Sequence, residues 1–204
     1  MRIRQFAALV ISTALPVLAH AHHPSGGVTP ATALDGLLSG FGHPVIGLDH
    51  LLFVLAIGAA CYYFGQRAGA VAAFLLAALG GTVLHLWKTT LPHPDAWVAV
   101  TLIGLGVLLI NASPFLRSKT AIGLLALAGL AHGYAYGEAI VGAEPTPIFA
   151  YLIGLTAVQG AVVLAGYALA RMADRRRPNL QTARVIGGTL SVAGLAFLAV
   201  SLSG

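Results

Sequence analysis

Six long apolar stretches, separated by short polar connections, dominate the chain beyond its first forty residues. A helix of about 20 apolar residues is long enough to cross a bilayer. We therefore predict an all-α membrane protein with six transmembrane helices. They cover residues 44–64, 69–87, 95–110, 120–140, 147–170 and 183–202, with the third the shortest.

The first residues have the organisation of a secretory signal peptide. Arg2 and Arg4 precede an apolar core that is short for a membrane span, and the small residues Ala19 and Ala21 offer two cleavage points. We expect a cleaved signal peptide over 1–21, a histidine-containing periplasmic segment over 22–43 with a short interfacial helix over 32–41, and a six-helix transmembrane domain over 44–204.

The cleavage point decides which histidines lie at the new terminus. Cleavage after Ala19 would leave His22 as the third residue, and an α-amine with a histidine there can bind Cu²⁺ or Ni²⁺ in a square of nitrogens. Cleavage after Ala21 would leave His22 and His23 at the end. A polar tail with incidental histidines explains them equally well.

Composition supports lipid as the solvent. Hydrophobic residues make up 58% of the chain and charged residues 8%, whereas soluble domains carry roughly 25% charged residues. The net charge of +5 does not indicate nucleic-acid binding, because the basic residues lie in short gaps between apolar stretches. The single cysteine, Cys61, excludes an internal disulfide and a cysteine-cluster metal site.

The basic residues predict the orientation. With the N-terminus outside, the outer connections hold only Lys88, and the inner ones hold Arg67, Arg117, Lys119, Arg171, Arg175, Arg176, Arg177 and Arg184. Loops rich in Lys and Arg stay in the cytoplasm. This agrees with the signal peptide and predicts a multi-pass protein of a bacterial inner membrane with a periplasmic N-terminus.

Ionisable residues gather in the outer half of this predicted topology. His43, Asp49 and His50 begin the first helix, and His132 and Glu138 lie near the end of the fourth. A lone membrane histidine is more often a hydrogen-bond partner between helices, but ionisable residues in a membrane are costly and are usually functional. Together these five predict a divalent-metal site at the mouth of a transporter.

The spacing of these residues sets conditions on that site. His43 and His50 share a face if the helix is continuous there, and Asp49 would be a ligand or a partner of a ligating imidazole. His132 and Glu138 are six apart and share no helical face, so either the helix loosens near Gly137 or the two residues contact different ions. A glycine stripe on the same segment, Gly129, Gly133 and Gly137, predicts close packing, which would bring the segment near the first helix.

Other polar positions leave alternatives open. His85, near the outer end of the second helix, is equally well explained as a ligand or as a hydrogen-bond partner between helices, and His93 in the following loop is the weaker candidate. Thr156 and Gln159 would line an inner path or bond between helices. Imidazole and carboxylate without thiolate suit Ni²⁺, Co²⁺, Zn²⁺ or Cu²⁺ better than Mg²⁺ or Ca²⁺.

Two motifs resemble those of the HupE/UreJ family of bacterial membrane proteins, and the resemblance covers the whole chain. The first comprises His43-Pro44, Gly47, Asp49-His50, Leu52-Phe53 and Gly58. The second comprises His132-Gly133, Ala135, Gly137 and Glu138, with Ala131 where an aromatic residue is common. The resemblance implies nickel uptake linked to hydrogenase or urease maturation, with cobalt or copper in some members, and functional roles for His43, Asp49, His50, His132 and Glu138.

We therefore expect a transporter, not an enzyme, that carries a divalent metal ion, most simply Ni²⁺, and keeps no cofactor permanently bound. Hydrogenase or urease accessory proteins are the partners that the resemblance implies, and no nucleic acid is expected. The chain has no nucleotide-binding loop. The alternatives are a Co²⁺ or Cu²⁺ transporter, a metal sensor or insertion accessory, a haem-binding protein and a metal hydrolase.

Overall fold

The computed structural model describes residues 28–65, 68–174 and 177–203, and every regular element in these ranges is helical. This confirms the predicted all-helical class. The predicted signal peptide and the candidate ligands His22 and His23 lie outside the described residues. The elements are α2 Ala33–Ile46, α3 Leu48–Phe64, α4 Ala68–Leu86, α5 Pro94–Ile110, η1 Pro114–Arg117, α6 Lys119–Gly137, η2 Glu138–Ile140, α7 Pro145–Ala173 and α8 Leu180–Ser203.

Three of the described helices, α4, α7 and α8, are long and apolar enough to cross a membrane. The bent pair α2 and α3 provides a fourth if it counts as one span, and α5 is a shorter apolar helix. Large apolar side chains such as Leu76, Leu164 and Val192 are about two-thirds exposed, which suits helices that face lipid. The structure thus has three to four candidate spans.

The first predicted helix is in fact two helices that meet at Gly47 with a bend of 79°. A capping box starts α2 at Ala33: the Thr32 hydroxyl accepts from the backbone N of Asp35 at 3.1 Å, and the Asp35 carboxylate accepts from the backbone N of Thr32 at 3.0 Å. The prediction of a short helix that ends near residue 41, followed by a new start at Pro44, was wrong, because this cap starts one helix that continues through Pro44.

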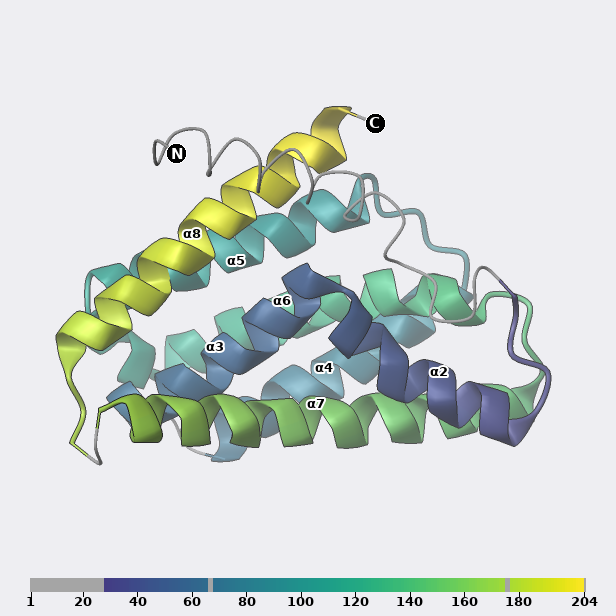
Figure 1. Ribbon diagram of the computed structural model, residues 1–204. Helices are drawn as coiled ribbons and strands as arrows, with labels where there is room; N and C mark the ends of the chain where they lie inside the picture. Colours follow the sequence, from purple (N-terminus) through teal and green to yellow (C-terminus); the bar gives the residue numbers. More distant parts are fainter. Residues whose placement is uncertain (1–27, 66–67, 175–176, 204) are drawn as a thin grey trace, which may run out of the picture.

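The helices pack mainly in pairs, α4 with α6, α5 with α8, and both α2 and α3 with α7 (Figure 1). Small residues allow the close contact of α4 and α6, since a Cβ on Gly133 would lie 1.9 Å from the carbonyl oxygen of Ala78. Thr82 joins the same pair by donating to the carbonyl of Gly133 at 2.9 Å. The predicted glycine stripe is therefore a close-packing surface, but it faces α4 and not the first predicted helix.

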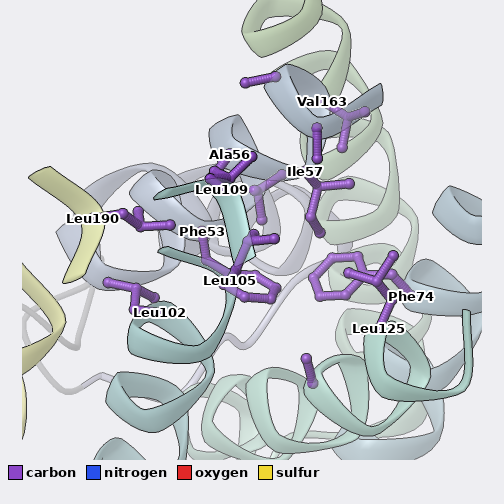
Figure 2. Close-up of a cluster of buried hydrophobic side chains, with 14 of the residues drawn as sticks. Phe53, Ala56, Ile57, Phe74, Leu102, Leu105, Leu109, Leu125, Val163 and Leu190 are labelled. Atoms are coloured by element: carbon purple, nitrogen blue, oxygen red, sulfur yellow. The ribbon is translucent and has the colours of Figure 1, made fainter. Parts of the chain in front are cut away.

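An apolar core holds α3 inside the bundle. Figure 2 shows buried side chains of this core lying together, among them Phe53 and Ile57 of α3, Phe74 of α4, Leu102 of α5 and Val163 of α7. Phe53 and Ile57 are each 1% exposed. Because α3 is buried on all these sides, the residues of its first turn have fixed positions relative to α6 and α7.

Candidate functional site

Three imidazoles are buried where α2 meets α3. His43 lies in the last turn of α2, His50 in the first turn of α3, and His132 on α6. His50 and His132 are 0% exposed and His43 is 2% exposed. Since 14 residues of α2 precede the break and 17 residues of α3 follow it, the histidines lie midway along the bent pair. The sequence had placed His43 and His50 at the outer end of the first predicted helix, and His132 near the outer end of the fourth.

The three rings form a connected group. Nδ1 of His50 lies 2.9 Å from Nδ1 of His132, which is a hydrogen-bond distance. The ring centroids of His43 and His50 are 5.9 Å apart. The Tyr136 ring packs against both, at 5.2 Å from His43 and 4.3 Å from His50. His43 and His50 were predicted to share one helical face if the helix were continuous. The helix is broken between them, and it is the break that brings the two rings together.

Two hydroxyl groups contact the outer members of this group. The Thr101 hydroxyl of α5 lies 2.9 Å from Nε2 of His132, and it donates to the carbonyl of Val98 at 2.7 Å. The Tyr151 hydroxyl of α7 lies 3.3 Å from Nδ1 of His43, and it donates to the carbonyl of Tyr136 at 2.8 Å. Helices α5 and α7 thus add polar atoms to the histidine site.

Asp49 brings a carboxylate to the same break. It is 4% exposed, and its Oδ1 accepts a hydrogen bond from the backbone N of His50 at 2.8 Å. In the first turn of α3 the carboxylate also faces the positive end of the helix dipole. Asp49 therefore places a negative charge beside the imidazoles.

The remaining predicted ligands lie elsewhere. The helix does loosen near Gly137, since α6 gives way there to a 3₁₀ turn. Glu138 on this turn, η2, is nevertheless exposed. Nδ1 of half-buried His85 lies 2.8 Å from the carbonyl oxygen of Tyr134, so His85 bonds between α4 and α6. His93 is exposed before α5. Within the described ranges, no three His, Cys, Asp or Glu side chains are grouped to hold a metal ion.

Sequence reasoning gave Thr101 and Tyr151 no role at the site. A hydroxyl in an apolar segment is the only signal that either offers, and many membrane helices carry such residues for packing. Gln159 of α7 is a related case: it is 1% exposed, and its Nε2 has no hydrogen-bond partner among the described residues. A buried donor without a partner is costly, which marks Gln159 as a residue to test.

The chemistry of the site follows from its donors. Neutral imidazoles offer a nitrogen lone pair, which suits divalent ions from Co²⁺ to Zn²⁺. The group also lies at a break in a helix, the arrangement that many transporters use to form ion sites inside the membrane. The site therefore contains imidazole nitrogens of the kind that bind transition metals, buried away from water and close to a point where the backbone bends.

Comparison with known proteins gives a family match and a relative. The sequence model of the family described as HupE / UreJ protein matches residues 8–197. Protein HupE of Rhizobium leguminosarum bv. viciae is 30% identical over 202 residues, which cover 97% of this chain and 99% of that protein. No solved structure matches.

Proposed function

Because the chain belongs to the HupE/UreJ family, we propose that it transports a transition-metal ion, Ni²⁺ in the first place, across the bacterial inner membrane. The observation that carries the proposal is the group of three buried imidazoles at the break between α2 and α3. Burying polar rings away from water is unfavourable unless they have partners or a function. A cation that crosses the membrane gives these rings a function.

The proposed topology has six spans. The bent pair of α2 and α3 is the first, and α4, α5, α6, α7 and α8 are the others. The connections from α5 to α6 and from α7 to α8 lie at one end of the bundle, and those from α4 to α5 and from α6 to α7 at the other (Figure 1). The first two carry Arg117, Lys119 and Arg177, so we assign that end to the cytoplasm and the N-terminus to the periplasm.

In the proposed mechanism the ion passes from exposed to buried ligands. Exposed Glu138 and the histidines His22 and His23 raise the local concentration of the ion on the periplasmic side. His43 and His50 then replace part of its water shell, while Asp49 offsets its charge. His50 and His132 hydrogen-bond to each other at 2.9 Å. This hydrogen bond has to break or rearrange before more than one nitrogen of the pair can face the ion.

The membrane potential is the simplest driver. A potential of 100 mV favours entry of a divalent cation by about 4.6 kcal/mol, twice the value for one charge. Uptake into vesicles should therefore fall when an uncoupler collapses an inside-negative potential. Uptake that is indifferent to the uncoupler would contradict this driver.

The ion would supply metalloenzyme maturation, with hydrogenase or urease accessory proteins as partners. A second candidate function is a sensor or insertion accessory, and one observation favours it: Nδ1 of His50 and Nδ1 of His132 bond to each other, and among the described residues no three His, Cys, Asp or Glu side chains form a ready coordination shell. Such a protein would bind metal in detergent and move none. A haem protein would instead show a Soret band after purification.

The deciding experiment measures the flux of Ni²⁺, Co²⁺, Cu²⁺ and Zn²⁺ into proteoliposomes. His50→Ala removes a buried ring, and His93→Asn is its matched control, because His93 is exposed and Asn tolerates its left-handed backbone (φ 50°). We expect flux of Ni²⁺ that His50→Ala abolishes and His93→Asn preserves. Tight binding without flux of any of the four ions would refute transport and favour the accessory.

A further inference from the structure

We infer that Thr101 and Tyr151 are positioning residues that fix the tautomers of the three histidines. As a result, Nε2 of His43 and Nε2 of His50 are the metal-binding atoms, and His132 supports His50. The assignment of metal-binding atoms rests on the proposed function, and the assignment of proton positions rests on hydrogen-bond geometry. The second assignment concerns which nitrogen of each ring carries hydrogen, a property that decides which one can bind a cation.

The Thr101 hydroxyl fixes the position of one proton on His132. Its hydroxyl oxygen lies 2.7 Å from the carbonyl oxygen of Val98, and a carbonyl cannot donate, so the hydroxyl hydrogen must lie between them. A hydroxyl has only one hydrogen. The second contact, at 2.9 Å to Nε2 of His132, is therefore one in which Thr101 accepts and Nε2 carries the hydrogen.

The proton on His132 determines which nitrogen of His50 carries hydrogen. With hydrogen on Nε2, a neutral His132 has its lone pair on Nδ1. Nδ1 of His50, 2.9 Å away, must then be the donor. A second hydrogen on His132 would create a cation with apolar rings around it, since Phe53 and Phe74 pack at 4.4 and 5.9 Å. Neutral His50 with hydrogen on Nδ1 carries its lone pair on Nε2.

The Tyr151 hydroxyl independently fixes the proton of His43. The Tyr151 hydroxyl lies 2.8 Å from the carbonyl oxygen of Tyr136, so its hydrogen points there. Its oxygen must accept from Nδ1 of His43 at 3.3 Å. His43 therefore also carries its lone pair on Nε2. Two hydroxyls on two different helices thus select the same nitrogen in both histidines that flank the break.

This arrangement gives each residue a separate task. His43 and His50 offer one lone pair each, from rings whose centroids are 5.9 Å apart on opposite sides of Gly47. Both nitrogens of His132 are engaged, one with His50 and one with Thr101. His132 then accepts the hydrogen bond from the N–H of a ligating histidine, a role that carboxylates and carbonyls usually have at metal sites.

The first test needs no metal. In protein labelled with ¹⁵N-histidine, NMR distinguishes the two neutral tautomers by their nitrogen shifts and couplings. We expect hydrogen on Nε2 of His132 and on Nδ1 of His43 and His50. Thr101→Val should change or mix the tautomer of His132, and Thr101→Ser should restore it. Tyr151→Phe should do the same for His43 alone. Wild-type His132 with hydrogen on Nδ1 would overturn the inference.

The second test uses Ni²⁺ as the probe. Thr101→Val and Tyr151→Phe should each lower its affinity by about 10–100-fold, the usual effect of removing a group that orients a ligand. Thr101→Ser should restore most of the affinity. X-ray absorption should count two imidazoles around Ni²⁺, and a count of three would overturn the supporting role of His132.

The two tests separate this inference from the proposed function. If the tautomers are as expected but the wild-type protein binds none of the four ions, transport and the ligand assignment fail together while the proton positions stand. If Ni²⁺ binds and crosses the membrane but Thr101→Val leaves both tautomer and affinity unchanged, the proposed function stands and the positioning role fails. Thermal unfolding of each variant in detergent shows whether the fold is retained.

Discussion

The Nδ1 atoms of His50 and His132 lie 2.9 Å apart although 82 positions separate the two residues in the chain. Neither helix sets this distance alone. Helix α3 is held by the apolar core, and α6 is held mainly by its close contact with α4. The geometry of the histidine site therefore depends on packing at glycines that lie outside it.

Gly133→Ala tests this dependence. A Cβ there would lie 1.9 Å from the backbone oxygen of Ala78, so α4 and α6 must move apart. We expect a loss of about 3 kcal/mol in the free energy of unfolding, at the upper end for an overpacked contact, and loss of Ni²⁺ flux because His132 moves with α6. Thermal unfolding in detergent and proteoliposome flux measure the two effects.

Gly123→Ala is the matched control on the same helix. Nothing lies within 4 Å of a Cβ at that position, so the change should be neutral or slightly stabilising in a helix. A Gly133→Ala protein with wild-type stability and flux would show that the close contact of α4 and α6 does not position His132.

Much of this fold could be predicted from the sequence, because apolar length and glycine spacing are local signals. The all-helical class, the helical segments and the close packing around Gly133 could be predicted from such local signals. The break at Gly47 could not, since Pro44 resembled a helix start, whereas the helix that begins after Thr32 continues through Pro44 to Ile46. The break changed where the site lies along the span.

Gly47→Ala tests the role of the break. The backbone at Gly47 (φ −70°, ψ 100°) suits any residue, so only the added methyl group matters. That Cβ would lie 2.8 Å from Cδ2 of His50, whose ring is fully buried against Tyr136. We expect about 1–3 kcal/mol of destabilisation and at least a tenfold loss of Ni²⁺ affinity, measured by titration calorimetry in detergent.

Gly104→Ala on α5 serves as the control for Gly47→Ala, because a Cβ there meets nothing within 4 Å. It should bind Ni²⁺ like the wild type. Wild-type affinity in Gly47→Ala as well would mean that His50 can shift without consequence, and would contradict its assignment as a ligand held in place.

Asp49→Asn separates charge from hydrogen bonding. The amide oxygen of Asn still accepts from the backbone N of His50, so stability should change by less than about 1 kcal/mol, the usual size of a charge–dipole effect. Ni²⁺ flux should fall at least tenfold, because the negative charge beside the imidazoles is gone. Asp49→Ala should lose stability as well as flux. Wild-type flux in Asp49→Asn would show that the site needs no carboxylate.

The candidate site was predictable only in part, and the reason is physical. His43, Asp49, His50 and His132 stand out because ionisable groups are rare in apolar segments. Thr101 and Tyr151 do not, because their contacts depend on how α5 and α7 pack against α2 and α6. Glu138 shows the reverse case, since it belongs to the motif that carries the family resemblance yet is exposed on η2.

Gln159→Leu distinguishes a structural residue from one used in transport. The Nε2 of Gln159 is buried near the Tyr136 hydroxyl but has no hydrogen bond of normal geometry to it or to any other described residue, and such a donor costs about 1–3 kcal/mol. Leucine of similar size removes that cost, so the variant should unfold at a higher temperature. If the amide serves the passing ion, flux should fall in the same protein.

Thr156→Val is the control one turn away on α7. Its hydroxyl bonds the carbonyl of Leu152 in its own helix at 2.8 Å, so both stability and flux should stay near the wild-type values. A Gln159→Leu protein that is more stable and transports Ni²⁺ at the wild-type rate would exclude Gln159 from the ion path. Since stability and flux are expected to move in opposite directions, simple misfolding cannot produce the predicted result.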